Sequence, residues 1–213
     1  GSMKTTLNIE HLEKSFGEQT VLKDINLSLE AGKIYGIEGY NGSGKSVLFK
    51  CICGLMIPDK GAVFLNGKER KAGEMLSDTG FIIEKPACLK KESGYKNLKL
   101  LYMINHKPDK EYLFDIMRKV GLDPDSKKPV DKYSLGMKQR LGIAQAIMGN
   151  PSILILDEPM NGLDKQGVED MRKLFFEIKE QGKLILLASH NKYDMEMLCD
   201  ERFEIEKGEV KRI

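Results

Sequence analysis

The sequence predicts an α/β protein in which helices cover a parallel sheet, with a small antiparallel sheet near the N-terminus and a helical segment inserted in the middle. Three observations predict this fold class. Segments near the N-terminus alternate apolar and polar residues, which is typical of half-exposed antiparallel strands. Three later segments are almost continuously apolar, as strands buried on both faces are. Between them lies a long stretch with apolar residues at helical spacing.

The bulk composition argues against several classes of protein. The formal net charge of +2 is too small to argue for binding to nucleic acid or to a membrane surface. Apolar runs such as residues 152–156 and 184–188 are far below the ~20 residues that a transmembrane helix needs. The spacing of the four cysteines fits neither a zinc site nor a disulfide framework, so we expect reduced thiols.

The antiparallel sheet is predicted from three segments. Residues 6–12 (TLNIEHL) and 25–30 (INLSLE) alternate in polarity and are expected to form half-exposed strands. Residues 62–69 (AVFLNGKE) add a strand and an Asn-Gly turn, which is a strong hairpin signal. Near the end of the chain, residues 202–213 are expected to form a further hairpin.

The parallel sheet is predicted from residues 33–39 (KIYGIEG), 152–157 (SILILD) and 183–189 (KLILLAS). Each segment is followed by a polar or glycine-containing stretch and then by a helical pattern, which is the alternation of α/β proteins. Such proteins bind ligands at the carboxyl ends of their strands. We therefore expect the functional residues directly after these segments.

The helical segment extends from about residue 95 to residue 149. Leu113, Met117 and Val120 recur at helical spacing and are expected to pack in the core. Asp109 precedes this stripe and is expected to cap the helix, because its side chain can accept a hydrogen bond from a free backbone N–H.

Residues 39–46 (GYNGSGKS) match the pattern G-x-x-x-x-G-K-[ST] in full. Glycines allow successive backbone N–H groups to point at phosphate oxygens, and the following helix adds its dipole. Lys45 would lie beside the β- and γ-phosphates, and Ser46 would offer its hydroxyl to Mg²⁺. Because the pattern lies between a buried strand and a helix, it predicts a nucleoside triphosphate site.

Charged side chains follow the other two buried strands. Asp157 and Glu158 end SILILD, and His190 ends LILLASH. A pair of exposed loop acids would also give this pattern. Beside a phosphate loop, we expect Asp157 to hold the Mg²⁺ shell and Glu158 to accept a proton from the attacking water. His190 is expected to contact the γ-phosphate, since ligands bind at this edge of the sheet.

In their order along the chain, these motifs resemble those of the ATP-binding subunits of ABC transporters, over essentially the whole length. Residues 39–46 resemble the Walker A loop and residues 153–159 (ILILDEP) the Walker B strand. Residues 161–164 (NGLD) resemble the D-loop, and His190 resembles the switch histidine. Residues 133–140 (YSLGMKQR) resemble the ABC signature.

The resemblance implies a P-loop NTPase fold with a RecA-like parallel sheet, an N-terminal antiparallel β subdomain and an inserted α-helical subdomain. We expect a single ABC ATPase domain over residues 1–213. Residues 1–83 and 151–213 would form the nucleotide-binding core, and residues 84–150 would form the helical subdomain that carries the signature.

The signature is a variant of the usual LSGGQ. Tyr133, Leu135 and Met137 replace its first, third and last residues, whereas Ser134 and Gly136 are kept. The resemblance implies a head-to-tail dimer, either a homodimer or a pair with another ABC subunit, in which each signature covers the nucleotide of the partner. Ser134 would cap its helix and bind the γ-phosphate, and Gly136 would leave room for the phosphate.

The resemblance also implies ATP and Mg²⁺ as cofactors. Glu158 would orient the water, while His190 and Lys45 would hold the γ-phosphate. Phe16 would stack on adenine, although a core aromatic in a strand fits the same position. Nucleotide contacts are expected from Phe16, Gly39, Tyr40, Asn41, Gly42, Ser43, Gly44, Lys45, Ser46, Val47, Ser134, Gly136 and, across the dimer, Asp164.

The metal ligands implied by the resemblance are Ser46, Asp157 and Glu84. The family usually has a glutamine at the position of Glu84. A carboxylate can coordinate Mg²⁺ but cannot donate a hydrogen bond. Together with SLGMKQRLGIA, this glutamate resembles the branch of the family that includes bacitracin-resistance and lantibiotic-immunity exporters.

The expected function is ATP binding and hydrolysis that power a separate membrane permease, which would export an antimicrobial peptide or another small compound. The permease would dock beside residues 84–103, and the subunit would lie in the cytoplasm at the inner face of the cell membrane. A soluble non-transport ABC ATPase, as in iron–sulfur cluster assembly, is the alternative. A GTPase would explain NKYD at residues 191–194 but not YSLGMKQR.

Overall fold

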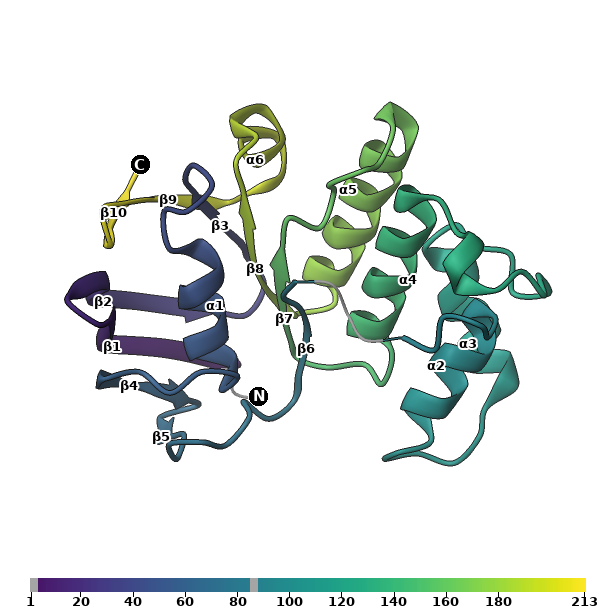
Figure 1. Cartoon of the computed structure of the whole chain (residues 1–213), viewed down its shortest axis with the longest axis horizontal. Coiled ribbons are helices and arrows are strands. Elements are labelled where there is room, and N and C mark those ends of the chain that lie inside the picture. Colours follow the sequence, from purple (N-terminus) through teal and green to yellow (C-terminus); the bar gives the residue numbers. More distant parts are fainter. Residues whose placement is uncertain (1–3, 85–87) are drawn as a thin grey trace.

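The structure is a computed structural model that describes residues 4–84 and 88–213. Its strands are β1 (Thr6–Phe16), β2 (Gln19–Glu30), β3 (Ile34–Glu38), β4 (Lys60–Leu65), β5 (Lys68–Glu69), β6 (Thr79–Ile82), β7 (Ile153–Asp157), β8 (Leu184–Ser189), β9 (Glu201–Glu206) and β10 (Glu209–Arg212). Its helices are α1 (Lys45–Cys53), α2 (Gly94–Tyr102), α3 (Lys110–Lys119), the 3₁₀ helix η1 (Val130–Lys132), α4 (Leu135–Ile147), α5 (Lys165–Glu180) and α6 (Lys192–Leu198). The antiparallel sheet lies at one end of the molecule, and α2 and α3 lie at the other (Figure 1).

The central sheet has the strand order β10-β9-β3-β8-β7-β6. All neighbouring pairs are parallel except β9 and β10, which form the predicted terminal hairpin. Every residue of β3 and of β8 is buried. Strands of this kind need cover on both faces, as their apolar sequences predict.

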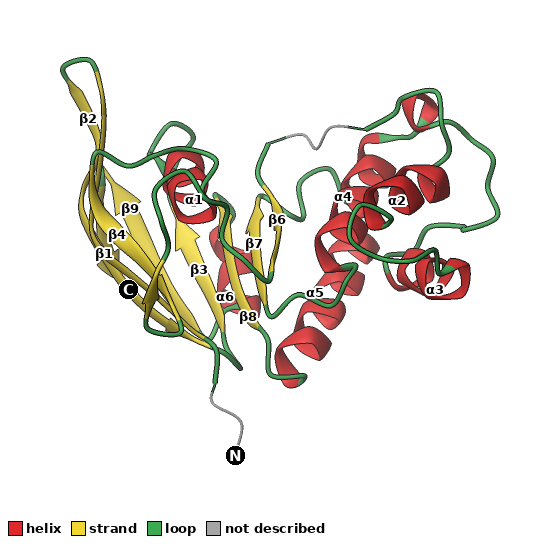
Figure 2. Ribbon diagram, turned by 90° about the horizontal axis from the view of Figure 1, so that it is seen from below, coloured by secondary structure: helices red, strands yellow, loops and turns green. Residues whose placement is uncertain are grey.

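Alternate residues of the central strands divide between two hydrophobic cores. Ile153 and Ile155 of β7 pack in a core with α1 and the antiparallel sheet. Leu154 and Leu156 pack in the other core, with α4, α5 and the helical insertion. Successive side chains of a strand point to opposite faces, so one short apolar strand serves both cores. Figure 2 shows α2 and α3 outside α4, on the side away from the antiparallel sheet.

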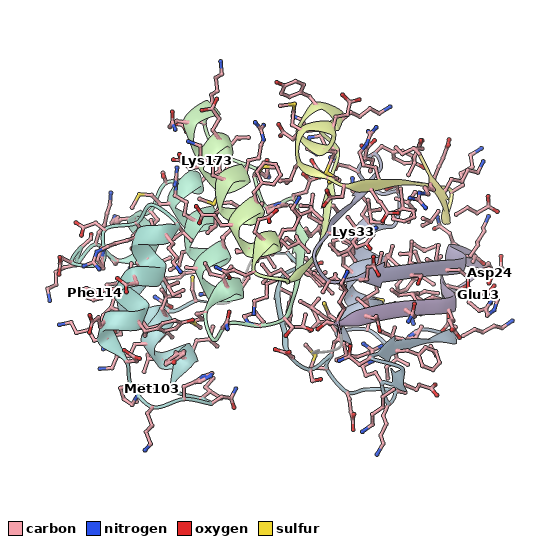
Figure 3. All side chains as sticks on the ribbon, turned by 180° about the vertical axis from the view of Figure 1, so that it is seen from behind. Glu13, Asp24, Lys33, Met103, Phe114 and Lys173 are labelled. Carbon is pink, nitrogen blue, oxygen red and sulfur yellow. The ribbon has the colours of Figure 1, made fainter. Side chains whose placement is uncertain are left out.

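The antiparallel sheet has the order β2-β1-β4-β5, and its first two strands are longer than predicted. The sequence predicts a first strand that ends at residue 12 and a second strand that begins at residue 25. His11 and Asp24 have φ angles of 50° and 45°, and the pairing of β1 with β2 shifts register beside them. These bulges interrupt the alternation of the sequence although the strands continue. Figure 3 shows Asp24 near the outer end of this sheet.

The helical insertion has the predicted core stripe and cap. Leu113, Met117 and Val120 are each 0% exposed. The side chain of Asp109 accepts a hydrogen bond of 3.1 Å from the backbone N–H of Tyr112. Together with the two sheets, this insertion confirms the predicted fold class.

All four cysteines are free. Cys51 and Cys53 are buried on α1, and burial raises the pKa of the Cys51 thiol to about 11 and that of the Cys53 thiol to about 12. Within residues 4–84 and 88–213, none of the helices combines the length and the apolar character needed to cross a bilayer.

The N-cap of α3 is tested by Asp109→Ala. The substitution leaves the N–H of Tyr112 without its side-chain acceptor, so we expect the free energy of unfolding to fall by about 1 kcal/mol. Urea denaturation measures this change. Asp125→Ala, at an exposed loop position, is the matched control. Equal stability of the two variants would contradict the role of the cap.

Candidate functional site

Three neighbouring strands end at the same level of the central sheet. Glu38 at the end of β3 pairs with Ser189 at the end of β8, and Asp157 at the end of β7 pairs with Ala188. The phosphate loop follows β3 directly, Glu158 follows β7, and His190 follows β8. The parallel register therefore gathers motifs that lie far apart in the sequence at one edge of the sheet.

The phosphate loop, residues 39–46, has the backbone shape that its glycines allow. Gly42 and Gly44 have φ angles of 87° and 107°, and Gly44 directly precedes α1. At Gly39, an added Cβ would lie 2.5 Å from the hydroxyl oxygen of Ser43. That hydroxyl is buried and has no hydrogen-bond partner within the described part of the chain. The loop is thus closely packed and carries an unsatisfied polar atom, as a cradle for an anion does.

The remaining loop residues differ in exposure. Lys45 is 5% exposed, and its ammonium donates a hydrogen bond to the backbone oxygen of Gly39. Tyr40 is 56% exposed, and Asn41 is also exposed, while Val47 is half-buried. The buried ammonium therefore lies inside the loop, and the exposed side chains lie on its outer surface.

Ser46 and Asp157 join the phosphate loop to β7. The hydroxyl of Ser46 donates a hydrogen bond of 2.5 Å to Oδ2 of Asp157. Burial raises the pKa of Asp157 above its ordinary value, the bond from Ser46 lowers the pKa in part, and the neighbouring carboxylate of Glu158 raises it further. Burial thus disfavours the ionised form of this carboxylate, and a cation beside it would stabilise that form.

Glu158 lies at the centre of the candidate site. Its Oε1 is 3.8 Å from Nζ of Lys45 and 2.8 Å from Nδ1 of His190. The backbone N–H of His190 also donates to this oxygen, at 3.1 Å. Glu158 has a φ angle of 50°, which is unusual for a residue with a side chain. Its carboxylate is thus held between the phosphate loop and the end of β8.

Comparison with known protein families shows the family of this chain. A profile described as "ABC transporter" matches residues 22–161, well over half of the chain. The chain belongs to this family. It is accordingly an ABC transporter ATPase, as the order of its motifs predicts.

Known relatives agree with the predicted branch of the ABC family. The chain is 39% identical over 194 residues to the lantibiotic transport ATP-binding protein SrtF of Streptococcus pyogenes, covering 91% of this chain and 84% of the relative. It is 40% identical over 201 residues to the bacitracin transport ATP-binding protein BcrA of Enterococcus faecalis, covering 93% and 65%. The structure of cbiO1 from Clostridium perfringens, part of the ABC transporter complex cbiONQ, has a TM-score of 0.82 at 27% identity over 98% of this chain and 88% of that one.

The ABC signature lies apart from the phosphate loop of its own chain. The hydroxyl of Ser134 accepts a 3.2 Å hydrogen bond from the N–H of Met137 and so caps α4. In Figures 1 and 2 the first turns of α1 and α4 lie on opposite sides of β7 and β8. Among the described residues, no hydrogen bond or ion pair joins Ser134 or Gly136 to residues 39–46. One chain of this ABC ATPase therefore does not bring its signature and its phosphate loop together.

Three further predicted residues lie outside the central cluster. Phe16 is 48% exposed at the end of β1, with the ammonium of Lys14 5.4 Å from its ring centre. The carboxylate of Glu84 forms an ion pair with Lys50 of α1. Asp164 caps α5 through a 2.7 Å hydrogen bond from a backbone N–H. The roles predicted for these three residues stay predictions.

Gln139 is a residue of the site that sequence reasoning missed. Its side-chain Nε2 donates hydrogen bonds to the backbone oxygens of Glu158, at 3.1 Å, and of Pro159, at 2.7 Å. Gln139 lies within the quoted signature stretch, but its partners are backbone atoms far away in the sequence. No local pattern could have named them.

The charge of Asp157 is tested by Asp157→Asn in protein without added nucleotide or metal. Because burial raises the pKa of Asp157 from its ordinary value of 3.8, its favourable contribution is complete below that value and is lost as pH rises through the higher folded-state pKa. We expect the variant to be more stable than wild type at neutral pH, with the difference shrinking toward acid pH.

Urea denaturation over a series of pH values measures this difference. Asp125→Asn is the control, because it removes the same charge from an exposed loop position outside the site. An Asp157→Asn protein that is less stable than wild type at neutral pH would contradict the assigned cost of the buried carboxylate.

Proposed function

We propose that the chain hydrolyses ATP in a head-to-tail dimer and that this dimer powers a separate membrane permease, which exports an antimicrobial peptide or another small compound. The observation that carries the hydrolytic part is the convergence of Lys45, Ser46, Asp157, Glu158 and His190 at the ends of β3, β7 and β8. These groups are an ammonium, a hydroxyl, two carboxylates and an imidazole. They supply the functions that phosphoryl transfer to water requires.

The phosphate loop would hold the triphosphate. Its backbone N–H groups and the start of α1 favour negative charge. The hydroxyl of Ser43 is buried without a partner in the described chain and is available to a phosphate oxygen. Lys45 would exchange its bond to the backbone oxygen of Gly39 for a bond to the β- and γ-phosphates.

The residues present fit a magnesium ion. The hydroxyl of Ser46 and the carboxylate of Asp157 are adjacent hard oxygen donors, and a cation beside them would offset the burial that raises the pKa of Asp157. Within the described residues no group of three or more His, Cys, Asp and Glu side chains could hold a metal. Mg²⁺ suits such a sparse site because it keeps waters and takes phosphate oxygens. Bound Mg²⁺ would neutralise charge on the phosphates, with Glu84 as a further proposed ligand.

Glu158 would act as the general base. Its carboxylate lies beside the ammonium of Lys45, where the γ-phosphate is expected. A water between the phosphate and Oε1 could give its proton to this carboxylate. His190 donates its backbone N–H to the same oxygen and also holds its ring there, so it fixes the direction of the carboxylate.

A second subunit would complete each ATP site. Ser134 caps α4 and is exposed, and Leu135 beside it is 57% exposed. The N-terminus of a helix attracts a phosphate, yet the phosphate loop of the same chain lies across the sheet. A copy in head-to-tail orientation would place Ser134 and Gly136 over the partner's γ-phosphate, with Phe16 on adenine and Asp164 at the interface.

The helical insertion offers a surface for the permease. Five apolar side chains around α2 are between 42% and 70% exposed: Leu89, Leu100, Leu101, Met103 and Ile104. Exposed apolar groups that gather on one element are typical of a protein-binding surface. Docking here would place this subunit at the cytoplasmic face of the membrane. The class of exported compound rests on the names of SrtF and BcrA.

The NKYD stretch, which favours a GTPase, has another explanation in its local structure. In the NKYD stretch, the side chain of Asn191 accepts a 3.1 Å hydrogen bond from the N–H of Asp194 and caps α6. These letters therefore form a helix cap and are explained without a guanine base. A strong preference of the purified protein for GTP over ATP would reverse this choice.

The base is tested by Glu158→Gln. The amide keeps the shape but cannot accept the proton of water, so we expect kcat to fall about 100-fold or more with ATP binding retained. A phosphate-release assay measures turnover, and size-exclusion chromatography with ATP should show a stabilised dimer. Lys45→Ala should instead lose tight nucleotide binding. Glu111→Gln, at an exposed position, should leave turnover, dimer formation and nucleotide binding unchanged. Wild-type turnover by Glu158→Gln would remove this residue from the mechanism.

The shared site is tested by mixing two inactive variants. In Lys45→Ala the phosphate loop fails, and in Ser134→Trp a bulky side chain blocks the signature. Each variant alone has two damaged sites in a homodimer. A mixed dimer has one intact site, which combines the phosphate loop of the second variant with the signature of the first. We expect ATPase activity to return on mixing, and a mixture as inactive as its components would argue against head-to-tail pairing.

A further inference from the structure

Helix α4, which begins at the signature, is hydrogen-bonded to the Walker B segment (residues 153–159) of the same chain. Gln139 lies in the second turn of α4, about one turn after the signature residues Ser134 and Gly136. Its half-buried amide donates to the backbone oxygens of Glu158 and Pro159, at 3.1 Å and 2.7 Å. Each bond fixes a peptide group of the loop that carries the proposed general base.

The backbone of Glu158 needs such support. Its φ angle of 50° lies in the left-handed region, which residues with a side chain rarely adopt. Its N–H donates to the oxygen of Ala188 in β8, at 2.8 Å, and its C=O accepts from Gln139. The residue is therefore held from β8 on one side and from the signature helix on the other. The direction of its carboxylate depends on both.

A second contact joins the same two segments. At Gly162, in the D-loop, an added Cβ would lie 2.6 Å from Cγ of Leu135. At Gly136, an added Cβ would lie 3.2 Å from the backbone oxygen of Gly162. The first turn of α4 thus packs directly on the D-loop, and Gln139 extends this contact to Glu158. Because packed groups resist compression, a movement of α4 would displace the D-loop and Glu158 as well.

We propose that Gln139 is a positioning residue for the general base and that it couples the signature to Glu158 of the same chain. The proposal rests on the proposed roles of Glu158 and of the signature. The signature meets the nucleotide of the partner, whereas Glu158 acts on the nucleotide of its own chain. When α4 shifts on meeting the partner's nucleotide, Gln139 carries the shift to Glu158, so each ATP site responds to occupancy of the other.

The substitution Gln139→Met tests this role because methionine has a similar length and no amide donor. We expect kcat to fall about tenfold or more, because a misplaced catalytic group loses its alignment. KM for ATP should stay within about twofold, since the phosphate loop is untouched. The fraction of ATP-dependent dimer, measured by size-exclusion chromatography, should be retained or increased, because hydrolysis of ATP is the step that lets the dimer dissociate.

A merely structural role would give a different result. If Gln139 only supported the signature helix, Gln139→Met would lower the dimer fraction together with kcat. Adding Gln139→Met to Glu158→Gln should cause no further fall in kcat, because the amide acts through the carboxylate. Gln181→Met, at the exposed end of α5, is the matched control and should behave as wild type.

The outcomes separate this proposal from the proposed function. If neither wild type nor Glu158→Gln forms a dimer with ATP, the head-to-tail mechanism fails. If both proteins form the dimer, two results would overturn the role of Gln139. One is a wild-type kcat for Gln139→Met, and the other is loss of its ATP-dependent dimer. Should Gln139→Met fail to fold, Gln139→Glu replaces it: the shape is kept, a carboxylate faces the two backbone oxygens, and the same split between kcat and dimer is expected.

Discussion

The register of the parallel strands is the constraint on which the candidate site depends. Because β3, β8 and β7 end at one level, the phosphate loop, the histidine and the carboxylates meet although they are far apart in sequence. A shift of one residue would turn every side chain of a strand to the other face. In these strands such a shift would exchange the side chains of the two cores, and the close packing of both cores opposes it. The position of the reacting groups therefore follows from hydrophobic packing.

The sequence predicts the features of the structure that are local. The phosphate loop needs glycines at fixed spacing, and the caps at Asp109 and Ser134 need one side chain near one N–H, so short patterns indicate them. The lengths of β1 and β2 could not be predicted in the same way. Their bulges at His11 and Asp24 depend on pairing between strands, and the sequence alternation stops there.

The contacts of Gln139 and of Glu84 could not be predicted for a related reason. Gln139 binds backbone oxygens, which every residue has, so no residue type at the other end marks the contact. The position of Glu84 in the chain predicts a metal ligand, and the structure shows its carboxylate beside Lys50. Both contacts exist only after the helical insertion and α1 have packed against the central sheet. The spacing of motifs along the sequence therefore cannot predict such long-range contacts.

The pair of Glu84 and Lys50 explains how a carboxylate is tolerated beside Asp157. Both Glu158 and Glu84 raise the pKa of Asp157, so each adds negative charge to a site that is already partly buried. A glutamine at position 84 would add no such charge. Helix α1 supplies Lys45 near Glu158 and Lys50 near Glu84, so one helix carries a cation toward each of the two neighbouring carboxylates. The glutamate at this position thus comes with its own counter-charge, placed on the helix that begins at the phosphate loop.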